Sequence, residues 1–261
     1  MWTHNSEKTL EKVLERINQV VPSKYINQRI ISDDHSTDNT KAIAEKLGWK
    51  VYDSPSKGIV ANVRNALNYV TCQFFASFEH DLLLNHNWWK NVSSIMESDL
   101  KVAVVQGIRV STNPIFQRLE SYQNCHVLTV KSLELSKQHQ SLDNCLCRTE
   151  VVRYFGFNET AVPSIMRSNG WKWFVDHSLV SDHLHGEFYG CLKHEYKMAA
   201  HTTHTKQEVW RGFRLLLTSP LRSMFIALET KYPIVFFAYP IDRLAVLLGM
   251  FKGISIGNKQ I

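Results

Sequence analysis

Strand-like segments alternate with helical segments through residues 7–105, and this alternation constrains the fold more than any other feature of the sequence. The strands are predicted at residues 29–32, 50–52, 72–78 and 102–105, and the helices at 7–21, 43–47, 59–70 and 87–96. Strands separated by helices of about 10–15 residues indicate crossover units in a mostly parallel sheet, covered by helices on both faces. The sequence therefore predicts an α/β fold whose ligand site lies beyond the carboxyl ends of the strands.

The second half of the chain is less regular. Helices are predicted at 114–135, 148–155 and 160–168, a strand at 142–146 and extended chain at 171–184. From residue 206 onward, three helical pieces are separated by Pro220 and Pro233, and Pro240 is expected to break the last piece. We therefore expect a catalytic domain over residues 1–205 and a helical segment over residues 206–261.

Composition excludes several classes of protein. At 44% hydrophobic and 11% aromatic residues, the 261-residue chain is too apolar to be disordered. Its five cysteines form no C-x-x-C pair, which favours reduced thiols in the cytosol over a disulfide framework or a zinc site. The longest apolar runs have eight residues, whereas a membrane span takes about 20. We expect a cytoplasmic protein.

Positive charge gathers at the C-terminal end. The net charge is +6, and residues 206–261 hold eight of the basic residues against three acidic ones. The nearly neutral remainder does not indicate nucleic-acid binding. Aromatic and leucine residues beside scattered arginine and lysine are typical of helices in a membrane interface, so we expect a peripheral contact with the cytosolic face of a membrane. Packing of these helices onto the domain, or a dimer contact, is the alternative.

Two acidic clusters follow predicted strands. Asp33 and Asp34 come after residues 29–32, and Glu79 and Asp81 come after residues 72–78. A nucleotide diphosphate suits this arrangement, because one cluster can accept hydrogen bonds from the base or ribose while hard carboxylate oxygens in the other hold a divalent cation. Either cluster alone is equally consistent with a solvated loop that caps a helix.

The residues around both clusters resemble the motifs of family-2 glycosyltransferases of the GT-A fold. Residues 31–40, ISDDHSTDNT, resemble the signature V-D-D-G-S-T-D-G-T, and FEHD at 78–81 resembles the strand end that carries the DXD motif. Lys57-Gly58 followed by Asn65 is similar to a G-x(n)-N segment. CRTEVVRYFGFNE at 147–159 resembles an arginine, an apolar helix and a closing G-F-x-E. The resemblance covers about residues 3–185 and implies a Rossmann-like GT-A sheet.

The resemblance implies a donor site with Mn²⁺ or Mg²⁺ as cofactor and a nucleotide-diphospho-sugar as substrate. Asp34 matches the aspartate that contacts the nucleotide base, with Asp33 in support. Asp81 matches the metal- and diphosphate-binding aspartate, and Glu79 stands at the first position of that motif as a ribose or metal contact. The remaining contacts to the nucleotide-sugar are implied for His4, Lys57 and Asn65.

The resemblance also implies an inverting transfer to a glycan or lipid acceptor. Glu159 falls on the position of the catalytic base, where the family has aspartate, and ten residues lie between it and Gly170-Trp171. A surface glutamate at a helix start is the alternative for Glu159. His183 and His185 lie on one face of the extended segment, where related transferases contact the diphosphate, so both are candidate metal or phosphate contacts. A plain surface pair is the alternative for these histidines.

The chain departs from the family at two places. Family members open with a strand of the type V-x-x-P-x-Y-N-E, and residues 2–7 match only its end, so we expect the first strand to be missing and to leave a gap in the sheet. Dolichyl-phosphate-sugar synthases have D-R-x-x-G-x-S-K where residues 182–188 read DHLHGEF, without the Ser-Lys pair.

Two further functions compete with the transferase. A nucleotidyltransferase of similar topology is disfavoured, because no glycine-rich phosphate loop stands near the N-terminus. The other alternative is a degenerate family member that binds nucleotide-sugar or a partner without turnover, which glutamate at positions 79 and 159 and the truncated start leave open.

Overall fold

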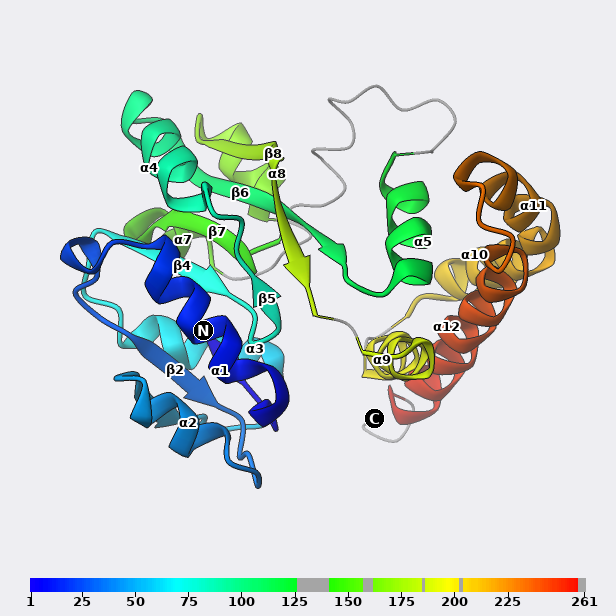
Figure 1. Ribbon diagram of the computed structural model, residues 1–261, viewed down its shortest axis with the longest axis horizontal. Coiled ribbons are helices and arrows are strands. Elements are labelled where there is room, and N and C mark those ends of the chain that lie inside the picture. Colours follow the sequence, from blue (N-terminus) through cyan, green and yellow to red (C-terminus); the bar gives the residue numbers. More distant parts are fainter. Residues whose placement is uncertain (126–140, 157–161, 185, 202–203, 258–261) are drawn as a thin grey trace. The chain divides into compact units, whose positions relative to one another are not determined.

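The computed structural model describes residues 1–125, 141–156, 162–184, 186–201 and 204–257 (Figure 1). The chain forms two compact units. The first comprises Met1–Val110 with Val130–Leu184, and the second comprises Ser111–Thr129 with His185–Ile261.

The first unit opens with a parallel sheet of three strands. Its order is β1 (Trp2–Thr3), β2 (Ile30–Asp33) and β3 (Lys50–Asp53). Helices α1 (Glu7–Val20), α2 (Thr40–Lys46) and α3 (Ile59–Asn68) and the short 3-10 helix Ser23–Tyr25 connect and follow these strands. The register places Thr3 opposite Asp33 and Asp33 opposite Asp53. Three polar side chains from distant parts of the sequence therefore meet at the carboxyl edge of this sheet.

Helix α1 shows why the predicted elements form. Its apolar residues recur at helical spacing, and Leu10, Val13, Leu14 and Ile17 are all buried. Each such side chain contributes about 1.5–3 kcal/mol when it is fully removed from water. The apolar face thus fixes the helix on the core that also contains Ile31 of β2.

A second sheet of five strands completes the first unit. Its order is β4 (Phe74–Phe78), β7 (Asn144–Arg148), β6 (Val102–Ser111), β8 (Lys172–His183) and β5 (Leu82–Leu83). Helices α4 (Trp88–Ser98), α7 (Thr149–Phe155) and α8 (Val162–Ser168) belong to the same unit. Cys72, Cys145, Cys147 and Cys191 are free thiols.

The expectation of a mostly parallel sheet needs correction for these strands. β4 and β6 both pair antiparallel with β7, and β5 pairs antiparallel with β8. Strand alternation predicts parallel pairing only where consecutive strands become neighbours through a helical crossover. Because β7 is inserted between β4 and β6, which precede it in the chain, the alternation does not set its direction.

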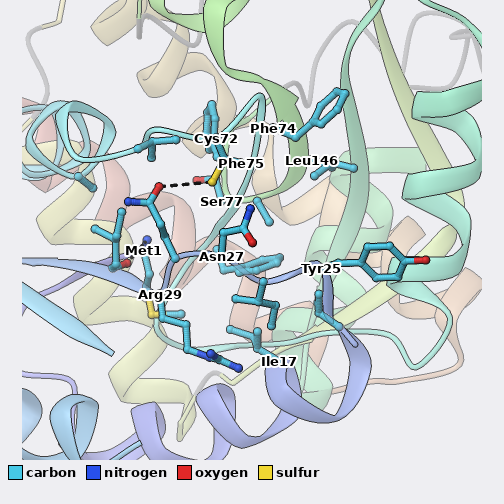
Figure 2. Close-up of a pocket in the computed structure, with 18 of the residues that line it drawn as sticks. Met1, Ile17, Tyr25, Asn27, Arg29, Cys72, Phe74, Phe75, Ser77 and Leu146 are labelled. Carbon is cyan, nitrogen blue, oxygen red and sulfur yellow. Dashed lines mark hydrogen bonds between the residues drawn. The ribbon is translucent and has the colours of Figure 1, made fainter. Parts of the chain in front are cut away.

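The expectation of a missing first strand also needs correction. Trp2 and Thr3 form β1 and pair with Ser32 and Asp33 of β2. A strand of two residues carries too little pattern to be found from the sequence alone. A cavity of about 490 Å³ opens nearby, lined mainly by apolar side chains that include Met1, Trp2 and residues of β4 (Figure 2). None of the predicted site residues that the structure describes lines this cavity.

The second unit is helical in its described part. It contains α5 (Pro114–Cys125), α9 (Phe188–His201), α10 (Lys206–Leu217), α11 (Ser219–Thr230) and α12 (Val235–Gly257). Helix α12 packs against the other four, most extensively against α9, a helix that the sequence analysis missed. No helix in the described ranges has both the length and the apolar character needed to cross a membrane.

The predicted proline boundaries hold at two of three positions. Pro220 lies in the first turn of α11, and Pro233 stands between α11 and α12. The expected break at Pro240 is wrong, because Pro240 lies inside α12. Proline removes one helical hydrogen bond, and the packing of α12 against α9 and α11 outweighs that loss here.

Candidate functional site

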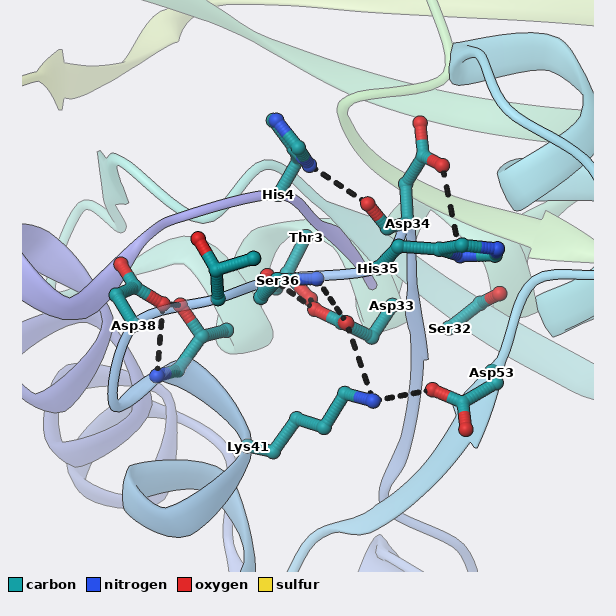
Figure 3. A network of polar contacts seen from close by, with 12 residues as sticks. Thr3, His4, Ser32, Asp33, Asp34, His35, Ser36, Asp38, Lys41 and Asp53 are labelled. Carbon is teal, nitrogen blue, oxygen red and sulfur yellow. Dashed lines mark hydrogen bonds and ion pairs between the residues drawn. The ribbon is translucent and has the colours of Figure 1, made fainter.

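Asp33 anchors the turn that follows β2. Its side chain is completely buried and accepts hydrogen bonds from Thr3 Oγ1 at 2.8 Å and from the backbone N–H and the hydroxyl of Ser36 at 2.8 and 2.6 Å (Figure 3). Lys41 Nζ lies 3.8 Å from the same carboxylate and 2.5 Å from Asp53 Oδ1. The Asp33 carboxylate therefore makes its hydrogen bonds within the protein and stabilises the turn.

Asp34 contacts two histidines through different atoms: its carboxylate Oδ1 lies 3.9 Å from His35 Nδ1, and its backbone carbonyl faces His4. Its backbone N–H donates to Thr3 O at 2.8 Å, and its Oδ2 accepts from the backbone N–H of Gly58 at 2.8 Å. Its Oδ1 is buried and has no hydrogen-bond partner among the described residues. His4 Nδ1 lies 2.6 Å from Asp34 O (Figure 3). The carboxylate Oδ1 of Asp34 therefore keeps an acceptor site that no hydrogen bond among the described residues uses.

Lys57 and Asn65 differ in their exposure to solvent. Lys57 is exposed to solvent next to Gly58, whose φ of 105° is a conformation that favours glycine. Asn65 is buried, and its Nδ2 donates to Ser32 Oγ at 2.9 Å and to Asp53 O at 3.1 Å. Asn65 therefore joins α3 to β2 and β3, while Lys57 keeps its ammonium available.

Glu79, Asp81 and His183 form a second cluster in the same unit. Glu79 and Asp81 follow β4, and His183 is the last residue of β8, opposite Leu82 of β5. His183 Nε2 lies 3.4 Å from Asp81 Oδ2 and 3.7 Å from Glu79 Oε2. One donor atom from each residue lies within 4.8 Å of the others. Two carboxylates and an imidazole are a donor set that suits Mn²⁺ and, through the oxygens, Mg²⁺.

Burial and charge act in opposite directions within this cluster. Burial raises the pKa of Glu79 to about 7, against the positive charge of Arg109. Burial also opposes ionisation of Asp81, but the hydrogen bond from His183 and the nearby positive charges outweigh it and lower the Asp81 pKa. For His183, burial would lower the pKa, and the contact with Asp81 raises it overall. The cluster therefore favours bound positive charge beside Asp81.

Two residues of this cluster were missed by the sequence analysis. Arg109 of β6 places Nη1 2.5 Å from both Glu79 Oε2 and Asp143 Oδ2. Asp143 directly precedes β7 and is almost completely buried. The available signal was an arginine inside the apolar strand 102–111 and an aspartate directly before another strand. Neither signal says that the two strands become neighbours.

The structure leaves two predicted site residues unplaced. Glu159, the predicted base, and His185, a predicted metal or phosphate contact, lie outside the described residues. Of the other predicted residues, it brings His4, Asp33 and Asp34 together at one strand edge, and Glu79, Asp81 and His183 together at another.

Comparison with known proteins gives a family profile and several solved structures. The profile described as "Glycosyl transferase family 2" matches residues 1–160. A mannosyltransferase from Pyrobaculum calidifontis, in complex with GDP-Man and Mn²⁺, is similar at 12% identity with a TM-score of 0.63, over 97% of this chain and 85% of that chain. No curated protein matches the chain.

Two mycobacterial structures are also similar. Glucosyl-3-phosphoglycerate synthase from Mycobacterium tuberculosis, in complex with Mn²⁺, UDP and glucosyl-3-phosphoglycerate, has 14% identity and a TM-score of 0.53, over 73% of this chain and 72% of that chain. A structure described only as a mycobacterial protein has 14% identity and a TM-score of 0.54, over 71% of this chain and 66% of that chain.

Proposed function

Because the chain belongs to glycosyl transferase family 2 and has the fold of GT-A glycosyltransferases, we propose that it transfers a sugar from a nucleotide-diphospho-sugar to an acceptor hydroxyl or lipid phosphate. Two of the similar solved structures contain GDP-Man or UDP together with Mn²⁺, which supports such a donor and a divalent cation. The observation that carries the proposal is the convergence of Glu79, Asp81 and His183 within 4.8 Å.

The donor set fits a divalent cation. Asp81 and His183 would hold Mn²⁺ or Mg²⁺, with Glu79 as a further ligand or a ribose contact, and His185 is proposed as an additional contact. When bound, the ion neutralises the charge that grows on the diphosphate leaving group. Asp34 would accept a hydrogen bond from the nucleotide base beside His4, and the exposed ammonium of Lys57 would attract the donor's negative charge.

We assign the role of base to Glu159 on the strength of the motif resemblance. Its carboxylate would take the proton of an acceptor hydroxyl as the acceptor oxygen attacks the anomeric carbon. The new carbon–oxygen bond forms on the face opposite the nucleotide. The bond to the diphosphate oxygen breaks, and the nucleotide diphosphate leaves with the electron pair. This single displacement inverts the anomeric configuration.

The proposed acceptor side includes a membrane surface. Helices α10, α11 and α12 expose large apolar side chains, among them Trp210, Leu217, Phe225, Leu228 and Phe237. Six basic side chains are exposed on the same three helices and the turn between α11 and α12: Lys206, Arg211, Arg214, Arg222, Lys231 and Lys252. Apolar groups beside basic ones suit a membrane with anionic headgroups. We propose residues 206–261 as a peripheral anchor at the cytosolic face, following a catalytic part over residues 1–205.

Thermal stabilisation by nucleotides tests the donor site. A ligand that binds only the folded state raises the melting temperature by mass action. We expect a shift with either UDP or GDP that requires Mn²⁺, is lost in Asp81→Asn, and persists in Asp99→Asn. Asp99 is a suitable control because it pairs with Lys172 at 2.6 Å on the surface of the same unit.

Turnover separates the transferase from a protein that only binds its donor. We expect Mn²⁺-dependent release of the nucleotide diphosphate from the matching nucleotide-sugar, and loss of release in Glu159→Gln. A nucleotide shift without release would favour the non-catalytic alternative. No shift with either nucleotide would contradict the proposed donor site.

A further inference from the structure

We propose that Arg109 and Asp143 are positioning residues that set the charge of the metal site. Arg109 pairs with Glu79, and Asp143 pairs with Arg109. The inference rests on the proposed function, since it needs a divalent cation at Glu79, Asp81 and His183. It goes beyond that function because neither residue belongs to the group whose donor atoms converge within 4.8 Å.

Three neighbouring strands hold the groups in question. β7 lies between β4 and β6, so Asp143, directly before β7, comes next to Glu79 after β4 and Arg109 in β6. The Arg109 guanidinium reaches both carboxylates at 2.5 Å. The backbone N–H of Glu79 also donates to Asp143 O at 3.3 Å. Backbone pairing therefore fixes the distance between the two carboxylates that share Arg109.

Asp143 is also held through its other carboxylate oxygen, Oδ1, which Arg109 does not contact in the pair described above. Ser141 Oγ donates to Asp143 Oδ1 at 2.7 Å, and the Ser141 backbone N–H donates to Gln106 Oε1 at 3.1 Å. Trp173 of β8 donates its indole N–H to the same Gln106 oxygen at 2.9 Å. Such a buried and connected network keeps a carboxylate in one orientation. Asp143 can therefore act as a fixed counter-charge to Arg109.

The charges explain what this arrangement does for a cation. Arg109 brings one positive charge next to Glu79, and Asp143 brings one negative charge to the same guanidinium. Loss of Asp143 therefore makes the surroundings of the site more positive by one charge, loss of Arg109 makes them more negative by one charge, and loss of both leaves the net charge unchanged. If the pair sets the charge of the site, the affinity for the cation follows these changes, because Coulomb interactions act across the few ångströms that separate these groups.

Mn²⁺ binding to the full, nucleotide-free chain tests the proposal. We would titrate Mn²⁺ and follow the free ion by its paramagnetic resonance signal, in the wild type, Asp143→Asn, Arg109→Gln, Arg109→Lys and the double variant Arg109→Gln/Asp143→Asn. Asp99→Asn is the control, because it also removes a carboxylate that is paired with a cation. A melting curve without metal checks that each variant is folded.

The expected order is specific. Asp143→Asn weakens Mn²⁺ binding roughly tenfold or more, the scale of one charge near the ion. Arg109→Gln tightens binding, Arg109→Lys keeps it near the wild type, and the double variant returns to within about threefold of the wild type by the same charge count. A purely structural role predicts instead that the double variant is at least as weak as the weaker single variant.

Each other outcome counts against the proposal. A double variant as weak as Asp143→Asn would overturn it, and so would an Asp143→Asn variant that binds like the wild type. If Asp143→Asn does not fold, the comparison of Arg109→Gln with Arg109→Lys decides, and weaker binding in Arg109→Gln overturns the proposal. A wild-type chain that takes up no Mn²⁺ would remove the metal site itself, whereas wild-type binding with the wrong order among the variants contradicts only the positioning role.

Discussion

The consecutive aspartates Asp33 and Asp34, at the end of β2, differ in their hydrogen bonding. Asp33 is fully buried and accepts three hydrogen bonds from Thr3 and Ser36, whereas Asp34 keeps one carboxylate oxygen without a hydrogen-bond partner among the described residues. Alternation along the strand explains the difference, because successive side chains point to opposite faces. One aspartate therefore stabilises the turn, and its neighbour keeps an acceptor oxygen that no hydrogen bond among the described residues uses.

Replacing Asp33 tests whether its hydrogen bonds stabilise the turn. Asp33→Asn removes the charge and puts an amide N–H₂ where the carboxylate accepts from Ser36 or Thr3. We expect a loss of about 2 kcal/mol of unfolding free energy, since a buried donor is left without an acceptor. Asp53→Asn is the matched control, because Asp53 pairs with the same Lys41 but is 69% exposed.

Urea denaturation of both variants measures the difference. The control should stay within about 0.5 kcal/mol of the wild type, as exposed ion pairs contribute little. Equal losses in the two variants would show that the ion pair with Lys41, and not the hydrogen bonds to Asp33, holds the turn.

The local sequence pattern points to the candidate site residues at strand ends, but it does not point to Arg109. Asp33, Asp34, Glu79 and Asp81 follow apolar segments, so their position is visible in the local pattern. Arg109 enters the cluster only through the order of strands β4, β7 and β6, which depends on long-range pairing. Periodicity of a single segment contains no information on that order.

At the scale of elements, Gly107 permits the close approach of β8 and β7 to β6. A Cβ added at Gly107 would lie 2.8 Å from Leu179 O and 2.9 Å from Asn144 Nδ2. Both contacts are shorter than a carbon atom allows without movement of its neighbours, and one of them is backbone. The spacing of these strands, two residues before Arg109, therefore requires glycine.

Gly107→Ala should lower the stability of the fold. The added methyl group has to push β8 away from β6, and overpacking of this kind costs about 1–3 kcal/mol. We expect a fall of several degrees in melting temperature, since 1 kcal/mol corresponds to roughly 2–4 °C in a chain of this size. Gly190→Ala in α9 is the control, because a Cβ there meets nothing within 4 Å.

The control should be neutral or stabilising by up to about 1 kcal/mol, because alanine is the better helix residue. A Gly107→Ala variant that melts with the wild type would mean that β8 moves freely against β6.

The elements that the sequence predicted correctly have an apolar pattern within their own residues. Helix α1 and strands β2, β4 and β6 have such patterns, and the structure confirms them. The missed or misjudged features are short or depend on partners. β1 has two residues, the direction of β7 depends on its neighbours, and α12 continues through Pro240 because α9 and α11 pack against it.

At the scale of the whole molecule, the helices of the second unit leave several large apolar side chains exposed to solvent. Leu217, Phe225, Leu228 and Phe237 are each 58% to 69% exposed. Soluble monomers rarely expose large apolar side chains in such number on neighbouring helices, and such surfaces mark interaction sites. The exposed basic residues on the same helices fit the proposed anionic membrane better than a purely apolar partner.

Vesicle sedimentation of the full chain tests this surface. We expect binding to vesicles that contain about a third of anionic lipid, and weak binding to neutral vesicles or at high salt, because each basic residue near the headgroups contributes about 1 kcal/mol only while it is unscreened. The double variant Phe225→Ser/Leu228→Ser should reduce binding roughly tenfold or more, since it removes two side chains worth about 1.5–3 kcal/mol each when buried. Leu100→Ser is the control, because Leu100 is 79% exposed in the first unit.

Self-association is the competing use of the same side chains, and it predicts different behaviour. If α10–α12 form a contact between copies, the sedimentation coefficient rises with protein concentration, the Phe225→Ser/Leu228→Ser variant abolishes that rise, and no vesicle composition matters. A membrane anchor instead gives binding that follows the anionic lipid fraction at fixed protein concentration. Vesicle binding that is equal on neutral and anionic lipid would contradict the role given to the basic residues, because the apolar side chains alone do not distinguish the two surfaces.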